Sequence, residues 1–219
     1  MSKYNDTIYS LSTPIGKSAI AVIRISGKDA FKILNRICSE KKIKPRVAKL
    51  TYLKFKKILI DQVLVTYFKK PKSFTGEDMF EINSHGGLAI IHKISKTIEF
   101  FGARQAEPGE FTKRALMNNK IDLVQTEGLS DLINAETEKQ RNLAISNLSG
   151  QLSFFLKDVK NEISLILANI EALIDFSDED LPDNILSNIE EQKKNIVKKI
   201  KTELKKSKIT RSITDGYTV

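Results

Sequence analysis

Two charged residues interrupt segments that otherwise suit the inner strands of a sheet. In MFEINS, a period of two places Phe80 and Ile82 on one face of a strand and Glu81 on the opposite face. In AIAVIRI, Arg24 lies among β-branched residues that favour a strand. A partly enclosed carboxylate or guanidinium needs an opposite charge or hydrogen-bonding partners. The sequence therefore predicts either ion pairing of Arg24 and Glu81, with each other or with the surface, or a polar ligand bound to them.

The stretch SFTGEDMFEINSHGG, residues 73–87, surrounds Glu81 with hydroxyls, acids and glycines that a core strand does not need. Its first residues, SFTG, have the composition of a turn. Its last residues, HGG, precede a predicted helix, and helix N-terminal N–H groups can receive an anion or the polar edge of a planar group. The same glycines are equally compatible with a simple tight turn, so both interpretations stay open here.

Several familiar catalytic sites are excluded by residue type and spacing. Gly16-Lys17-Ser18 has the ending of a P-loop, but Leu11 stands where that motif requires its first glycine, so we expect no P-loop hydrolysis of nucleotides. Two histidines and the single Cys38 give little support for zinc, and no Gly-x-Ser-x-Gly elbow is present. The acids between 175 and 183 lack the calcium-loop pattern and suit a helix end and turn. We therefore predict no catalytic residue and no metal ligand.

The first half of the chain alternates strand-like and helix-like patterns. A lysine-bearing turn separates two neighbouring strands and predicts a hairpin, and Gly102 is placed to end the second helix. The predicted strands span 19–25, 47–55, 58–68 and 79–84, and the predicted helices span 28–38 and 87–101.

Beyond Phe111 the strand patterns disappear and helical periodicity dominates. We place a domain boundary near Asn118, giving domains 1–118 and 119–219. A capping box at Thr137 opens an apolar seam that predicts one long helix as far as Leu173. A lysine-rich helix follows from Ile185. The fold class is α+β, a mixed-sheet domain followed by an all-α domain.

Composition limits the class of protein and its partners. The formal charge of +9 favours a polyanionic partner, although a merely solvated lysine-rich surface is the alternative. The lysine-rich helix 193–208 has the same two interpretations, phosphate binding or a solvated amphipathic helix, and the second is more common. A single cysteine allows no internal disulfide, the N-terminus lacks a secretory signal, and no apolar run spans a bilayer. We expect a cytoplasmic protein that does not enter a membrane.

Four motifs resemble, in order and spacing, the N-terminal region of the MnmE (TrmE) family of tRNA-modification GTPases. The resemblance covers essentially all 219 residues, and SFTGED...HGG and PGEFTKRA are its most specific parts. The motifs are TPIGKSAIAVIRISG, DQVLVTYFKKPKSFTGEDMFEINSHGG, PGEFTKRALMNNKIDLVQTEGLSDLINAET and DFSDED.

The resemblance implies both architecture and activity. Such proteins begin with an α+β domain, similar to tetrahydrofolate-dependent aminomethyltransferases, that binds 5-formyltetrahydrofolate and forms a homodimer. A helical domain follows, and a Ras-like G domain is inserted into it. With the flavoprotein partner MnmG, the family installs an aminomethyl or carboxymethylaminomethyl group at C5 of the wobble uridine of certain tRNAs.

One departure from the family pattern affects what this chain can do. The sequence stops at DGYTV, where the first strand of the G domain would begin. The resemblance therefore implies a fragment with an incomplete helical bundle, whose exposed apolar faces make that half the less stable one. GTP, magnesium and potassium would bind only through the missing G domain, so this chain alone should not hydrolyse GTP.

The family's folate contacts fall on Arg24, Glu81 and Lys120 of this sequence. A carboxylate such as Glu81 can accept hydrogen bonds from the ring N–H and exocyclic amine of a pterin. Arg24 or Lys120 could neutralise the anionic glutamate tail, and the resemblance does not say which. Two alternatives remain: an RNA-binding module in which Arg24 and Glu81 only pair with each other, and a folate-dependent aminomethyltransferase that acts on a small molecule or a protein.

Overall fold

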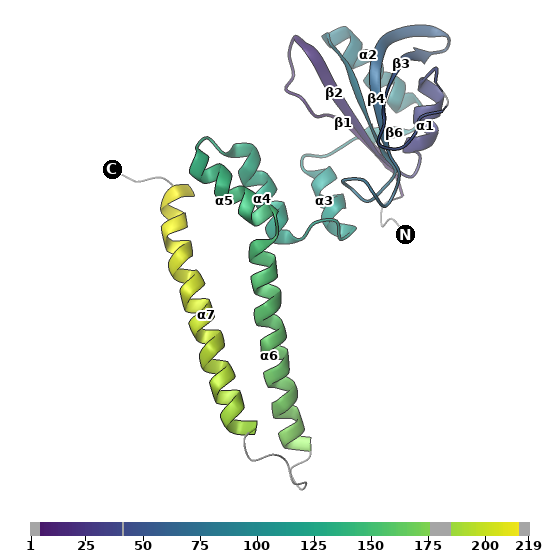
Figure 1. Cartoon of the computed structure of the whole chain (residues 1–219). Coiled ribbons are helices and arrows are strands. Elements are labelled where there is room, and N and C mark those ends of the chain that lie inside the picture. Colours follow the sequence, from purple (N-terminus) through teal and green to yellow (C-terminus); the bar gives the residue numbers. More distant parts are fainter. Residues whose placement is uncertain (1–4, 41, 176–184, 215–219) are drawn as a thin grey trace. The chain divides into compact units, whose positions relative to one another are not determined.

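The computed structural model describes residues 5–40, 42–175 and 185–214, with side chains of the last helix as far as Lys205. The chain divides into two compact units, Met1–Ile121 and Asp122–Val219, which are treated separately below. The division lies between 121 and 122, close to the boundary that the loss of strand pattern predicts. The first unit is α+β and the second is helical (Figure 1).

The first unit contains a six-stranded mixed sheet with the strand order β3-β4-β5-β2-β1-β6. All neighbouring strands are antiparallel except β1 and β6, which are parallel. The predicted hairpin is confirmed, because β3 and β4 pair directly. The strands are β1 Thr7–Leu11, β2 Ser18–Gly27, β3 Ala48–Phe55, β4 Ile58–Phe68, β5 Met79–Gly86 and β6 Ala103–Gln105.

Three helices accompany this sheet: α1 Ala30–Ile37, α2 Leu88–Phe100 and α3 Glu110–Met117. The apolar stripes of α1 and α2 pack on one face of the sheet and form the core with alternate residues of the central strands. Phe80 and Ile82 belong to this core and are fully buried, as the strand pattern predicts. Because side chains alternate along a strand, Arg24 and Glu81 are directed to the opposite face.

The second unit is built from four helices within the described ranges: α4 Leu123–Asn134, α5 Glu138–Leu148, α6 Gln151–Asp175 and α7 Ile185–Thr214. Side chains close a capping box at the start of α5, as predicted at Thr137, and a second box at Asp122 starts α4. None of the helices in the described ranges is both long enough and apolar enough to cross a membrane.

The single long helix expected from Thr137 to Leu173 is wrong. The structure divides it into α5 and α6 at Ser149-Gly150, where Gly150 has φ +85°. A left-handed residue ends a helix, and glycine adopts that conformation without steric penalty. The apolar periodicity continues on both sides of the break, which is why the pattern alone conceals it.

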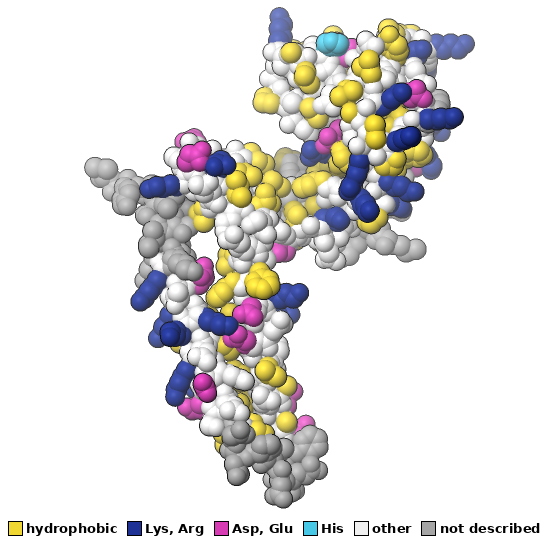
Figure 2. All heavy atoms as spheres, in the orientation of Figure 1, with side chains coloured by type: hydrophobic (Ala, Val, Ile, Leu, Met, Phe, Trp, Pro, Cys, Tyr) yellow, Lys and Arg dark blue, Asp and Glu magenta, His cyan; other side chains and the backbone are white. Residues whose placement is uncertain are grey.

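The lysine-rich helix α7 packs beside α6 and forms ion pairs with it. Lys199 on α7 forms ion pairs with Asp158, at 3.1 Å, and with Glu162. Several apolar side chains of α6 remain exposed, among them Phe154 at 76% and Leu165 at 55%. Figure 2 shows hydrophobic side chains on the visible surface of the helical unit. The acids that were expected to form a helix end and turn lie outside the described residues, apart from Asp175, the last residue of α6.

Gly128 provides a test of packing in the second unit. A Cβ at this position would lie 2.8 Å from the backbone nitrogen of Leu148 and 2.9 Å from Cβ of Asn147. We predict that Gly128→Ala destabilises the contact between α4 and α5 by about 1–3 kcal/mol, although alanine favours helix by about 1 kcal/mol. Amide hydrogen exchange of α4 and α5 measures this effect, with the exposed Ser130→Ala as control. Unchanged or slower exchange in Gly128→Ala would show that the helices tolerate the methyl group.

Candidate functional site

Arg24 and Glu81 face each other across the two central strands. They occupy one register position of the β2–β5 pair, and Thr66 stands opposite Glu81 on β4. Nε of Arg24 donates to Oε1 of Glu81 at 2.9 Å, and a terminal nitrogen of Arg24 contacts the same oxygen at 2.8 Å. The interpretation as an ion pair therefore describes the structure without a ligand. Both contacts use Oε1, and no contact to Oε2 is found among the described residues.

Two aromatic rings fix the guanidinium of Arg24. Its Cζ lies 5.7 Å from the ring centroid of Phe74 and 5.9 Å from that of Phe111. A guanidinium over an aromatic face gains cation–π attraction and loses rotational freedom. The side chains of Arg24 and Glu81 remain 31% and 22% exposed, so the pair is accessible from one side.

A cavity of about 440 Å³ opens beside Glu81. Glu81 and Lys120, which the family resemblance assigns to one ligand, both line it, although they lie far apart in the sequence. Arg24 does not line the cavity but is held at its edge through Glu81. The other lining residues are Arg46, Phe68, Lys72, Ser73, Phe74 and Met79.

Lys120 reaches this cavity because the chain after α3 packs on the turn between β4 and β5. Asn118 donates through Nδ2 to the carbonyl of Thr75 at 2.7 Å, and Nζ of Lys120 donates to the carbonyl of Pro71 at 2.9 Å. Gly76 has φ +77°, and a Cβ there would lie 3.2 Å from side-chain carbons of Lys120. A larger residue at 76 would therefore both strain the turn and displace Lys120.

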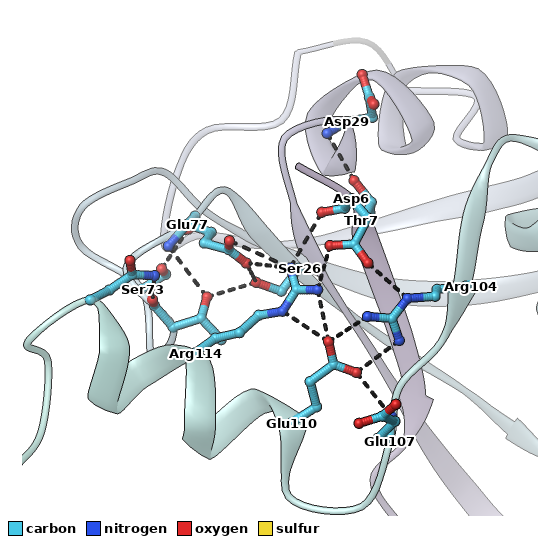
Figure 3. Close-up of polar contacts among 12 residues, drawn as sticks. Asp6, Thr7, Ser26, Asp29, Ser73, Glu77, Arg104, Glu107, Glu110 and Arg114 are labelled. Carbon is cyan, nitrogen blue, oxygen red and sulfur yellow. Dashed lines mark hydrogen bonds and ion pairs between the residues drawn. The ribbon is translucent and has the colours of Figure 1, made fainter. Parts of the chain in front are cut away.

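A buried ionic network links the turn between β4 and β5 to α3 (Figure 3). Arg114, which is fully buried, contacts Glu77 at 3.2 Å, Glu110 at 2.9 Å and Asp6 at 2.7 Å. Arg104 binds both oxygens of Glu110 and also pairs with Asp6 at 2.7 Å. The network joins the start of β1, the turn before β5, β6 and α3. Such an arrangement fixes geometry strongly, because removing one partner leaves a buried charge uncompensated.

Hydroxyl groups extend the network to β2. Oγ of Ser26 donates to Oε2 of Glu77 at 2.9 Å and lies 2.6 Å from Oγ1 of Thr75. Oγ of Ser73 donates to the carbonyl of Glu77. The hydroxyls and acids of SFTGED that looked superfluous for a strand are therefore used to fold this turn.

Sequence reasoning did not identify the network. Glu110 and Arg114 have the i, i+4 spacing of a helix ion pair, and that spacing was a readable signal. Most such pairs are exposed, and only the tertiary structure shows that both residues are buried beneath the turn. The partnership with Glu77 joins distant segments, and no local pattern reports it.

The network also perturbs acid–base equilibria. Hydrogen bonds from Arg104, together with the backbone N–H of Glu107 and Arg114, lower the pKa of Glu110 to about 2, against the opposing effect of burial. Burial raises the pKa of Asp6, but hydrogen bonds and charge from Arg114 and Arg104 outweigh it and lower that pKa overall. Both carboxylates are therefore ionised at neutral pH and stabilise the folded state.

The two histidines contribute nothing to the cavity. Nδ1 of His85 lies 2.8 Å from Oδ1 of Asp61, and His92 is exposed on α2. No group of three or more His, Cys, Asp or Glu side chains is placed to hold a metal ion in the part of the chain that the structure describes. A larger hollow of about 710 Å³ lies between α6 and α7, but two of its three acids, Asp158 and Glu162, are already paired with Lys199.

Comparisons with known proteins match the two units separately. A family model described as the GTP-binding protein TrmE N-terminus matches residues 7–120, and one described as the MnmE helical domain matches residues 123–218. Similar relatives are named tRNA modification GTPase MnmE. That of Neorickettsia sennetsu is 42% identical over 214 residues, which cover 97% of this chain and 39% of the relative. That of Pelagibacter ubique is 41% identical over 221 residues, with 97% and 49% covered. The chain spans less than half the length of these relatives.

The pKa of Glu110 predicts how the stability of the first unit depends on pH. A carboxyl whose pKa falls from 4.5 to about 2 on folding contributes about 3 kcal/mol at neutral pH. This contribution is complete above the unfolded pKa and is lost as pH falls toward the folded pKa. We predict that the stability difference between wild type and Glu110→Gln, measured by urea unfolding, shrinks by about 2 kcal/mol between pH 7 and pH 3. A difference that does not vary with pH would contradict the ionised network.

Proposed function

Because the chain belongs to the MnmE (TrmE) family of tRNA-modification GTPases, we propose that its first unit binds 5-formyltetrahydrofolate in the cavity beside Glu81. In this proposal the folate is the one-carbon donor for modification of C5 of the tRNA wobble uridine. The product carries an aminomethyl or carboxymethylaminomethyl group, and the flavoprotein MnmG is the partner in the reaction.

The proposal rests on one observation, the oxygen of the Glu81 carboxylate that Arg24 leaves available. Arg24 orients it from one side and uses only Oε1, so Oε2 keeps its two lone pairs. The ring N–H and the neighbouring amino group of a pterin are both donors on one edge, and they match this acceptor. A carboxylate fixed by a strand and an arginine is already oriented, so little conformational entropy is lost when the ligand binds.

The rest of the cavity suits the remainder of the ligand. Phe68, Phe74 and Met79 supply apolar surface for the rings. Lys120 supplies positive charge toward the glutamate tail, while Arg24 acts on the pterin side through Glu81. This division of roles assigns the tail to Lys120, a choice that the sequence leaves open.

The Glu81 carboxylate can keep its ion pair with Arg24 and bind a ligand at the same time. A purely structural pair needs no adjacent cavity, yet a cavity of about 440 Å³ lies against Glu81 and carries three further cations. In the proposal Arg24 holds the carboxylate in place in both the free and the bound state.

Other parts of the reaction are assigned elsewhere. We place no general acid, base or nucleophile in this chain, and its residues bind and orient the donor. We assign GTP, magnesium and potassium to a G domain outside the two matched ranges. The first unit also forms the homodimer in this proposal, supported by exposed apolar residues such as the cross-strand pair Leu50 and Leu64.

Calorimetric titration with 5-formyltetrahydrofolate tests the folate proposal. We predict that the wild-type chain binds and that Glu81→Gln weakens binding at least tenfold, about 1.4 kcal/mol, because an amide accepts through only one oxygen. Glu107→Gln, an exposed acid outside this cavity, is the matched control and should bind like wild type. Absence of binding heat with the folded wild-type chain would refute the proposal.

A further inference from the structure

The cavity carries more positive charge than the sequence motifs indicate. Arg46, Lys72 and Lys120 all line it, and its one acid, Glu81, already pairs with Arg24. No carboxylate within the described residues forms an ion pair with any of these three cations. Lone cations are common on surfaces, but three that converge on one cavity produce a local field that favours an anion.

Backbone carbonyls hold two of these cations against the same short segment. A terminal nitrogen of Arg46 donates to the carbonyl of Lys72 at 3.1 Å, and Nζ of Lys120 donates to the carbonyl of the preceding Pro71 at 2.9 Å. Each contact uses one donor of a group that has several, and leaves its charge unneutralised. The two head groups are thus positioned before any anion binds.

The backbone of Arg46 is held in an unusual conformation. Its φ of +61° lies in the left-handed region, which is strained for a residue other than glycine. The N–H of Arg46 donates to the carbonyl of Tyr67 at 2.7 Å, which holds the strained conformation beside β4. Strain of this kind persists where the surrounding structure fixes it, and it is concentrated at ligand sites.

Positive charge continues beyond the cavity along the same turn. Lys69 and Lys70 are exposed and directly precede Pro71. The nearby acid Asp78 accepts from the hydroxyl of Tyr67 at 2.7 Å and from the backbone N–H of Lys70 at 3.1 Å. Figure 2 shows many Lys and Arg side chains on the visible face of this unit.

We propose that Arg46 and Lys72, together with Lys120, form a subsite for a chain of several carboxylates, so that the donor is bound as a poly-γ-glutamyl folate. The inference rests on the proposed folate function and extends it to the length of the tail. A single glutamate brings two carboxylates, and each further γ-linked glutamate adds one. Three cations in the cavity and two beside it therefore exceed what one glutamate can neutralise.

The test compares 5-formyltetrahydrofolate carrying one glutamate with the same compound carrying three, by calorimetry on the whole chain. Because exposed ion pairs each contribute modestly, we expect the triglutamate to bind roughly tenfold more tightly at low salt. The advantage should shrink at high salt, since these cations are exposed. In Arg46→Gln/Lys72→Gln the ratio of the two affinities should fall to about twofold or less.

Two further variants separate the subsite from general charge and from misfolding. Lys17→Gln/Lys54→Gln removes the same charge from exposed positions outside the cavity and should keep the wild-type ratio. Lys72→Gln alone leaves the strained backbone of Arg46 untouched and should reduce the ratio partially.

The outcomes are distinguishable from failure of the folate proposal. If the monoglutamate binds and the triglutamate binds no more tightly, the subsite is refuted while folate binding stands. If neither compound binds, the proposed function itself fails. An equal loss of the ratio in both double variants would also refute the subsite. A missing tail advantage combined with tRNA binding that drops only in Arg46→Gln/Lys72→Gln would overturn it in favour of phosphate binding.

Discussion

The first unit depends on one buried guanidinium. Arg114 has no exposed surface, and it is held by carboxylates from the residue before β1, from the turn before β5 and from its own helix. The ionic network links α3 and the turn to the sheet. A buried network of this kind specifies one geometry, because any other leaves charges unpaired.

The cavity follows from that geometry. The sheet supplies Glu81 and Arg24 at a register position set by strand pairing, which is independent of the network. The turn and the chain after α3 supply the cationic wall, which includes Lys72 and Lys120, and the network links the turn to α3. A rigid acceptor on a strand and a positively charged wall on a turn therefore form one pocket. The charged residues of the network do not line the pocket, although Ser73, whose hydroxyl donates to the carbonyl of Glu77, does.

Local sequence patterns predicted most helices and strands. They failed where contacts between distant segments determine the structure. The strand alternation around Phe80 placed Glu81 on the correct face, and the hairpin, the first helices and the cap at Thr137 were predicted correctly. The break at Gly150 was missed because apolar periodicity continues through it. Arg46 and Arg114 were missed because each acts through a partner distant in sequence or through an unusual φ, and neither property leaves a local signature. Family membership is now shown, whereas the ligand assignments of Arg24, Glu81 and Lys120 stay predictions.

We infer that the charged residues of the buried network shape a pocket that they do not line. The most direct measurement is the affinity of Glu77→Gln for 5-formyltetrahydrofolate, taken under conditions where circular dichroism shows the variant to be folded. This near-isosteric change removes one of the three carboxylates that pair with Arg114 and leaves every cavity residue intact. We predict an affinity at least about tenfold lower than that of the wild type. A folded variant that binds the folate as tightly as wild type would contradict it.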